Sequence, residues 1–367
     1  MIYLDNAATT KPCKEAVDAA NAVMAENFGN ASSLHRAGIG AERVLKESKK
    51  TLLDLIGAEE GELIFTSGAT ESNNTAILGV AEAYRHGGKR IVTTATEHPS
   101  VAVPVDKLAE RGYEAIRLAP KDHDDFEEAL AAAVDENTLL VSAIWVNNET
   151  GFITDPLKLY RAVKRRNPKT LVHIDAVQGF RKLPSDRLKG DLISLSAHKI
   201  HGLKGSGALY TAKGVRFTPL LYGGGQQGGL RSGTEPIELI AAFAAAAKAY
   251  PDSTARYAAL AQALRSLLLP LGGITFNSEH NAPNILNFSV AGVRSEIMLH
   301  ILEEREIYVS SGSACSRGKK SRVLAAFGVG DENADTAVRV SFCPATTEDD
   351  LRALADGVRA GIERIRR

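Results

Sequence analysis

The chain of 367 residues carries 44 basic and 44 acidic side chains, so its formal net charge at pH 7 is zero. A chain of this length can bury a large core and can form two domains. The balanced charge gives no indication of a nucleic-acid partner or of a membrane surface, and we expect neither.

The first residues and the cysteines favour a reducing, cytoplasmic setting. The opening stretch, MIYLDNAATT, contains neither the basic nor the apolar region of a signal peptide. The most apolar helical stretch, ELIAAFAAAAKAY, is too short to cross a bilayer. Cys13, Cys315 and Cys343 are odd in number and lack CxxC spacing, so we expect neither a disulfide framework nor a structural zinc site.

Short apolar runs alternate with helical patterns over the first 250 residues. Helical patterns such as SNNTAILGVAEAYRHG and FEEALAAAVDE separate runs that are rich in β-branched residues. This alternation is typical of an α/β fold in which helices cover a mostly parallel sheet. The seven predicted strands are 62–67, 90–94, 114–118, 138–146, 170–174, 191–195 and 207–211.

The pattern changes near residue 250. A long helical stretch, TARYAALAQALRSLLLPLG, is followed by mixed strand and helix patterns up to the C-terminus. We therefore expect a second, smaller α+β domain in this part of the chain.

Polar clusters follow five of the predicted strands. Ligands of open parallel sheets bind outside the carboxyl ends of the strands, so the clusters together predict one ligand site. Each cluster taken alone has an ordinary explanation, because Asp175 could cap a helix and His98 could be structural. The clusters are GATE (68–71), TEH (96–98), NNE (147–149), Asp175 with Gln178, and SAHK (196–199).

Two stretches could bind phosphate. TSGATES (66–72) places small and hydroxylated residues just before a helix, where free N–H groups attract anions, although an ordinary capped helix has the same appearance. GGGQQGG (223–229) formally contains GxGxxG, but it lies outside a clear βαβ unit. It is either a flexible turn or a phosphate loop closed by Arg231, Ser232 and Thr234.

Lys199 indicates which kind of ligand the predicted site binds. A solvated surface residue is the ordinary interpretation of a lysine. Here, however, an amine follows a buried strand beside a phosphate signature, the strand-end acid Asp175 and the imidazole of His98. Pyridoxal phosphate requires a lysine for its aldehyde and a carboxylate for its pyridine nitrogen. These groups therefore predict a pyridoxal-phosphate enzyme with Lys199 as the attachment point.

At this level of detail the sequence resembles the cysteine desulfurases of the class V aminotransferase group. The matching motifs occur in the family's order and extend over almost the whole chain. They are YLDNAATT (3–10), FTSGATESNN (65–74), TEHPSV (96–101), VNNETG (146–151), HIDAVQ (173–178), SAHKIHG (196–202), GGGQQGGLRSGT (223–234), APNILNFS (282–289), SSGSAC (310–315) and VRVSF (338–342).

The resemblance implies a homodimeric enzyme with the aspartate aminotransferase fold, known as fold type I. Residues 13–250 would form the large domain that binds pyridoxal 5'-phosphate, and 1–12 with 251–367 the small domain that carries the cysteine loop. The enzyme would convert L-cysteine to L-alanine and hold the sulfur as a persulfide. An acceptor protein, in iron–sulfur cluster assembly or in thiolation, would then receive that sulfur.

The resemblance also assigns the cofactor site. Lys199 would carry the cofactor, His98 would stack on its ring and move protons, Asp175 would pair with the pyridine nitrogen, and Gln178 with the phenolic oxygen. The remaining implied cofactor-binding positions are Ala69, Thr70, Asn148, Ser196, His198 and, reaching in from the partner subunit, Thr234.

The substrate side is implied in the same way. Arg339, with Asn148 and Asn30, would bind the substrate carboxylate, a task suited to a guanidinium. Cys315 matches the sulfur-accepting nucleophile, and the basic stretch after it, SRGKKSR, favours a thiolate. A small apolar side chain is the ordinary role of a free cysteine, and we assign that role to Cys13 and Cys343.

Several alternatives remain at this point. The segment between Cys315 and Val323 is shorter than in family members whose cysteine loop reaches a scaffold protein. A selenocysteine lyase or another class V enzyme would share the cofactor site. A nucleotide-binding or scaffold protein would use GxGxxG alone and leave Lys199 on the surface. We expect no metal, because the pair His198 and His201 lacks a third ligand.

Overall fold

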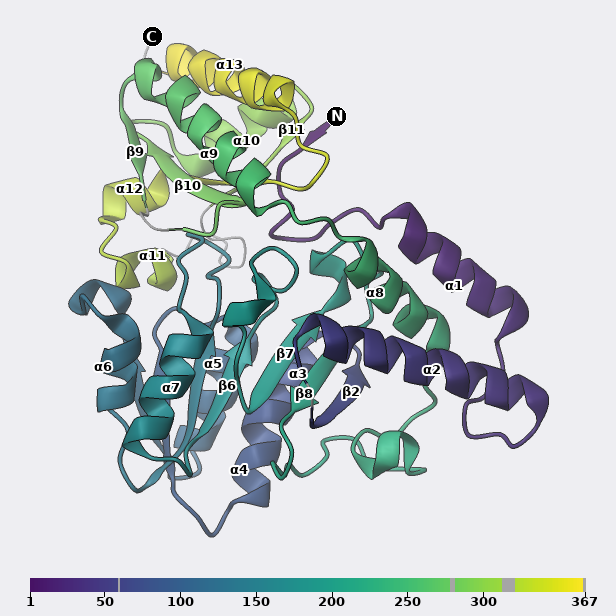
Figure 1. Ribbon diagram of the computed structural model, residues 1–367. Coiled ribbons are helices and arrows are strands. Elements are labelled where there is room, and N and C mark those ends of the chain that lie inside the picture. Colours follow the sequence, from purple (N-terminus) through teal and green to yellow (C-terminus); the bar gives the residue numbers. More distant parts are fainter. Residues whose placement is uncertain (59, 278–280, 312–320, 366–367) are drawn as a thin grey trace.

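The structure is a computed structural model, and it describes residues 1–58, 60–277, 281–311 and 321–365. Its larger part is built on a seven-stranded sheet with helices on both faces (Figure 1), which confirms the predicted fold class. All seven predicted strands form, and their ends differ from the prediction by at most two residues. In sheet order they are β2 (Glu62–Thr66), β8 (Gly207–Thr211), β7 (Leu192–Ser196), β6 (Leu171–Asp175), β5 (Thr138–Ile144), β3 (Arg90–Thr94) and β4 (Glu114–Leu118).

Strand direction brings the predicted polar clusters to one edge. Only β8 runs antiparallel to its neighbours among these seven strands, while β7, β6, β5, β3 and β4 pair in parallel. The residues that follow β7, β6 and β5 therefore leave the sheet on the same side. This is the side that faces the smaller part of the molecule in Figure 1.

The two faces of the large sheet are covered by different helices. Successive side chains of a strand point to opposite faces, so in β5 Val141 packs with one helix group and Leu140 with the other. Both faces are covered, which is why β5 is buried along its whole length. The first group is α2 (Arg36–Leu55), α6 (Phe126–Ala132), α7 (Pro156–Arg166) and α8 (Ile237–Ala249), and the second is α4 (Val80–Ala83) with α5 (Pro99–Ala109).

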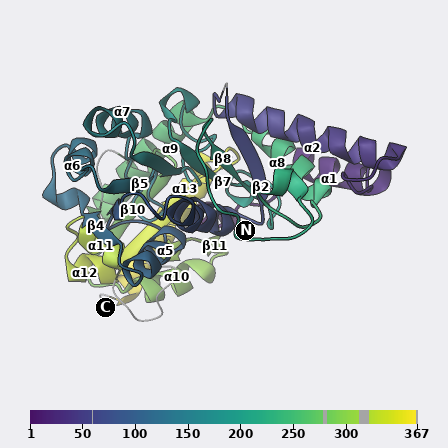
Figure 2. The same ribbon diagram turned by 90° about the horizontal axis from the view of Figure 1, so that it is seen from below.

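The predicted helix after β2 is interrupted. It comprises α3 (Ala69–Asn74), a π-helical turn (Thr75–Gly79) and α4. Near the N-terminus, α1 (Lys14–Glu26) packs against α8, and together with α2 these helices lie to one side of the sheet (Figure 2). Within the described ranges, no helix combines the length and the apolar character needed to cross a membrane.

The smaller part of the molecule contains a four-stranded antiparallel sheet. Its apolar face packs against three long helices, and its other face looks toward the large sheet. The strands in order are β12 (Ser310–Ser311), β13 (Ala337–Ser341), β10 (Ile285–Val290) and β9 (Ile274–Phe276). The packing helices are α9 (Thr254–Leu268), α10 (Ser295–Glu303) and α13 (Glu348–Ile365), and two short helices, α11 (Arg322–Ala326) and α12 (Asp331–Asp335), lie nearer the large sheet.

The N-terminal residues join this smaller part. Strand β1 (Ile2–Tyr3) pairs in parallel with β11 (Ile307–Tyr308), and Leu4 enters the apolar core beneath α9 and α13. The chain then runs along β13, where Ser341 Oγ accepts a hydrogen bond from the backbone N–H of Ala7 (2.8 Å). From there it crosses to the carboxyl edge of the large sheet.

Candidate active site

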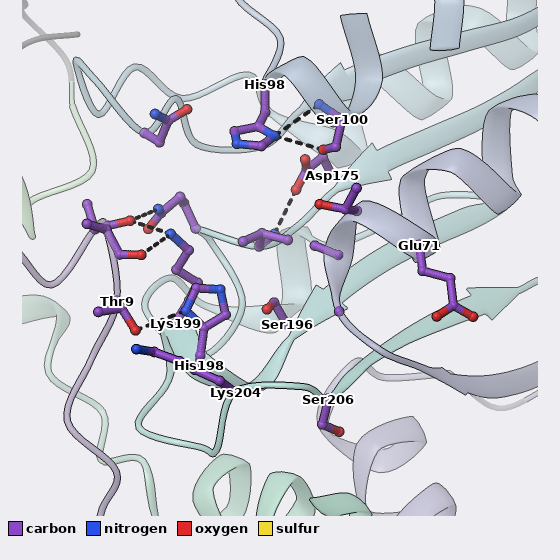
Figure 3. Close-up of a pocket in the computed structure, with 18 of the residues that line it drawn as sticks. Thr9, Glu71, His98, Ser100, Asp175, Ser196, His198, Lys199, Lys204 and Ser206 are labelled. Atoms are coloured by element: carbon purple, nitrogen blue, oxygen red, sulfur yellow. Dashed lines mark hydrogen bonds between the residues drawn. The ribbon is translucent and has the colours of Figure 1, made fainter. Parts of the chain in front are cut away.

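A cavity of about 590 Å³ lies at the carboxyl edge of the large sheet (Figure 3). Side chains from several strand ends and from the crossing N-terminal segment meet in it. Ten of the residues proposed from the sequence line it: Ala69, Thr70, His98, Asn148, Asp175, Gln178, Ser196, His198, Lys199 and Arg339. The prediction that the strand-end clusters share one site therefore matches the geometry.

Two of the proposed site residues do not line this cavity. Asn30 is exposed in the turn between α1 and α2, where its side chain accepts a hydrogen bond from the N–H of Ser32 (2.9 Å). Thr234 is also exposed and does not line the cavity of its own chain. Cys315 lies outside the described residues.

Lys199 extends from a short turn after β7 toward the N-terminal segment. Its Nζ donates to the carbonyl oxygens of Ala7 (2.6 Å) and Ala8 (2.7 Å), and the side chain is half-buried (Figure 3). Both carbonyls belong to the YLDNAATT motif. The segment thus holds the amine at the cavity wall, a role that the sequence pattern alone did not assign to it.

Asp175 ends β6 and is only 2 % exposed. Its Oδ1 accepts from the N–H of Val177 (3.1 Å), and its Oδ2 accepts from Asn73 Nδ2 (2.9 Å). Burial raises the pKa of this carboxyl, whereas the Val177 N–H and the charges of His98 and Lys199 act against that shift. A cationic group facing Asp175 in the cavity would favour its ionised form.

His98 is held as one tautomer by its neighbours. It is the N-cap of α5, and its Nδ1 accepts from the N–H of Ser100 (3.1 Å). Ser100 Oγ lies 2.8 Å from the same nitrogen and accepts from Asn73 Nδ2 (2.8 Å), so its own proton is free to point at Nδ1. A ring nitrogen that accepts carries no proton, and the neutral imidazole therefore carries its proton on Nε2.

The electrostatics agree with a neutral His98. Burial lowers the pKa of His98, the nearby Asp175 raises it, and Lys199 lowers it, with a net lowering. Asn73 contacts both Asp175 and Ser100, so one amide links the carboxylate to the imidazole. Asn73 and Ser100 were not proposed from the sequence, although both lie inside quoted motifs.

The end of the cavity near β7 and β8 fits an anion. The hydroxyls of Ser196 and Ser206 are buried and have no hydrogen-bond partner among the described residues. Lys204 lines the same cavity, and burial together with the charge of Lys199 lowers the pKa of His198 to about 4. Buried hydroxyls normally have partners, so these two indicate room for a ligand acceptor such as a phosphate oxygen.

Glycines at this end allow the chain segments to approach. A Cβ at Gly207 would lie 2.6 Å from the Cα of Gly68, so only glycine allows β8 to pass so close to the turn before α3. Gly68 itself has φ of 152°. The predicted phosphate signature is thus packed directly against β8 and β7.

Arg339 enters the cavity from the smaller part of the molecule. It lies on β13 between Val338 and Val340, which point to the apolar core, and it is 2 % exposed. Its guanidinium donates to Asp5 Oδ1 (2.7 Å) and to the carbonyl of Asn148 (2.9 Å). Asp5 was not proposed from the sequence.

The glycine-rich stretch 223–229 lies away from this cavity. Gln227 bonds both the N–H (2.7 Å) and the carbonyl (2.9 Å) of Phe65, and so it caps the edge strand β2. Arg231 forms an ion pair with Glu71 (2.9 Å). In the part of the chain that the structure describes, no group of three metal-ligating side chains comes together.

Comparison with known proteins places this geometry in a family. The family model "Aminotransferase class-V" matches residues 2–354. The chain belongs to the class V aminotransferase family. It is 40 % identical to a "NifS/IcsS protein homolog" of Lactobacillus delbrueckii subsp. bulgaricus, with 95 % of this chain and 94 % of that protein covered.

Further relatives support the resemblance drawn from the motifs. The "Cysteine desulfurase IscS" of Neisseria meningitidis serogroup C is 37 % identical, with 100 % of this chain and 93 % of that protein covered. A solved structure named "NIFS-LIKE PROTEIN" superposes with a TM-score of 0.91 at 33 % identity and covers 99 % of both chains. The predicted family is thereby confirmed.

Proposed function

We propose that this class V aminotransferase homologue is a cysteine desulfurase that uses pyridoxal phosphate to convert L-cysteine to L-alanine. The observation that carries the proposal is the set of groups in one cavity: the amine of Lys199, the buried carboxyl of Asp175, and the hydroxyls of Ser196 and Ser206, which have no hydrogen-bond partner among the described residues. Relatives named as cysteine desulfurases and NifS homologues over nearly their whole length support the same activity.

The residues present fit the cofactor at each end. Lys199 would attach it, Asp175 would face its pyridine nitrogen, and Gln178 would meet its ring oxygen. Ser196, together with the turn before α3, would hold its phosphate. When bound, pyridoxal phosphate supplies an electron sink that stabilises negative charge on the neighbouring substrate carbon.

The chain's own groups supply the proton transfers and the orientation. His98 is neutral, so it can first take up a proton and then, as the imidazolium, donate one back. Arg339 has a buried Nε without a partner among the described residues, and it is fixed by Asp5 and by the Asn148 carbonyl. A guanidinium fixed in this way is suited to bind the substrate carboxylate.

We place the sulfur transfer on Cys315. Its thiolate attacks the substrate sulfur, the carbon–sulfur bond breaks, and the electron pair of that bond stays on the carbon fragment, which takes up protons and leaves as alanine. The persulfide sulfur then passes to an acceptor protein. In a homodimer, Thr234 and Asn30 are exposed on each chain and would be available to the partner subunit's site.

The test replaces Cys315 by serine, which is similar in size but a far weaker nucleophile toward sulfur. We expect Cys315→Ser to bind pyridoxal phosphate normally, to form no persulfide, and to release little alanine from cysteine. Cys13→Ser and Cys343→Ser are the matched controls and should behave as the parent. Alanine release at the parental rate by Cys315→Ser would place the nucleophile elsewhere and favour a selenocysteine-lyase-like reaction.

A further inference from the structure

A second lysine, Lys182, is buried beside the cavity. Its side chain is 4 % exposed, and no carboxylate among the described residues lies within ion-pair distance. Burial, acting together with the positive charges of Lys199 and Arg339, lowers its pKa to about 7. Burying a lysine amine without a carboxylate partner costs folding free energy. We therefore ask what the amine contributes to the neighbouring cavity.

The one hydrogen bond of the Lys182 amine in the described structure goes to Gln178. Lys182 Nζ donates to Gln178 Oε1 over 2.9 Å. A lysine amine can donate to an amide oxygen in either protonation state, and that bond fixes which end of the Gln178 amide points away from the cavity. Consequently Gln178 turns its Nε2 toward the N-terminal segment, where it donates to the Ala7 carbonyl (2.7 Å).

The Ala7 carbonyl connects this pair to the proposed attachment point. The same oxygen accepts from Lys199 Nζ (2.6 Å). Lys182, Gln178, Ala7 and Lys199 therefore form one chain of contacts, in which a group that lies outside the cavity lining sets the orientation of groups inside it. Without the Lys182 donor, a buried carbonyl oxygen of Gln178 would have no partner, or the amide would turn over.

We propose that Lys182 is a positioning residue. By donating to Gln178 Oε1 it keeps the Gln178 amide nitrogen on the side of Ala7 and the cavity, and it thereby affects how the cavity binds pyridoxal phosphate. This inference rests on the proposed function, because Gln178 is the residue expected to meet the ring oxygen of the cofactor. A lysine that only filled space would be replaceable by any side chain of similar volume.

The experiment is a double-mutant cycle read out by cofactor binding. Apoprotein of the parent, Lys182→Met, Gln178→Ala and the double variant is titrated with pyridoxal phosphate, and affinity and the position of the visible absorption band are recorded. Methionine preserves most of the volume but cannot donate. We expect Lys182→Met to weaken binding roughly 10-fold and to shift the band in the parent background, but to change affinity less than about 2-fold in the Gln178→Ala background.

Two further variants make the result specific. Lys182→Gln retains a donor for Gln178 Oε1 and should recover most of the affinity and the parental band, and it also serves if Lys182→Met folds poorly. Lys248→Met, on the exposed end of α8, is the matched control and should match the parent. Equal losses in both backgrounds, or an unchanged band in Lys182→Met, would overturn the proposal. A parent that binds no pyridoxal phosphate would instead overturn the proposed function.

Discussion

The carboxyl edge of the large sheet and the apolar face of the small sheet are both buried, but they are built in opposite ways. At the edge, Glu97 and Ser196 have buried oxygen atoms that lack a partner among the described residues. On the small sheet, Leu286, Phe288 and Val340 are buried against helices and carry only apolar side chains. Buried polar atoms without partners lower the free energy of unfolding in the first region, whereas apolar burial raises it in the second.

The face of the small sheet that looks toward the cavity follows a third pattern. Asn287 and Arg339 lie on this face and are buried. Both donate hydrogen bonds to the loop that follows β5: Asn287 Nδ2 to the Glu149 carbonyl (3.0 Å), and Arg339 to the Asn148 carbonyl (2.9 Å). Along β10 and β13, side chains therefore alternate between the apolar core and the cavity side of the sheet. We therefore expect substitutions at the cavity edge and in the apolar core to affect different measurements.

The largest effect is expected at Lys199. Lys199→Ala should lower alanine production at least roughly 10³-fold, because the amine proposed to attach the cofactor and to move protons is lost. Borohydride should no longer fix the cofactor to the chain. The midpoint of thermal unfolding should change little, since Lys199 is half-buried and its amine donates to two carbonyls of the crossing segment. A variant that unfolds much earlier than the parent would show that Lys199 is structural.

The opposite result is expected at Phe288, which is fully buried in the small-sheet core. Phe288→Ala should lower the free energy of unfolding by about 3–5 kcal/mol through lost apolar contact and a cavity. Denaturant unfolding measures this change. Below the unfolding transition the affinity for pyridoxal phosphate should stay within about 3-fold of the parent. A large loss of affinity in the folded variant would contradict the separation of the two regions.

A pH-dependent effect is expected at Glu97. Burial raises the pKa of this carboxyl to about 8, from an ordinary value of 4.5, against hydrogen bonds from Thr94 and the Ile144 N–H. Between these two pH values the folded state binds more protons than the unfolded state, so parental stability falls as pH rises, by up to about 1.4 kcal/mol per pH unit. Glu97→Gln lacks this titration. The unfolding midpoint of Glu97→Gln should therefore rise relative to that of the parent as the pH increases from 5 to 8. A difference between the two midpoints that does not change with pH would contradict the raised pKa of Glu97.

The smallest effect is expected at Ser206. Its hydroxyl is buried without a partner among the described residues, so Ser206→Ala should stabilise the apoprotein by about 1 kcal/mol. If the hydroxyl receives a phosphate oxygen, the same variant should bind pyridoxal phosphate a few-fold more weakly. Thermal unfolding with and without the cofactor measures both effects. A gain in stability with no change in affinity would place Ser206 outside the phosphate site.

The sequence predicted those features that follow from strand direction. Seven apolar runs indicated the sheet, and parallel pairing places the residues after β6 and β7 side by side, so Asp175 and Lys199 could be assigned to one cavity. The motifs then identified the family. These inferences needed only local patterns and a general rule about sheets.

Other parts of the site depend on the path of the chain in space. Arg339 and Asp5 are 334 positions apart, and no local pattern indicates their ion pair. Lys182 follows no strand directly, and its role is visible only because Gln178 is seen to accept its hydrogen bond. Thr234 was proposed to act from a partner subunit, which a single chain does not show. Asn30 was proposed beside Arg339, but it is exposed in the turn between α1 and α2.

The pairing of β1 with β11 has a consequence for biosynthesis. Residues 2–3 are made early, but their partners are residues 307–308, and the bridge from Asp5 reaches Ser341. At roughly 5 to 20 residues per second, the ~300 residues between the two strands take about 15 to 60 s to be synthesised. During that time the Ala7 and Ala8 carbonyls cannot be anchored over Lys199 by the strands that hold them in the finished fold. The large sheet can form on the ribosome, whereas a binding-competent cavity has to wait for the last tenth of the chain.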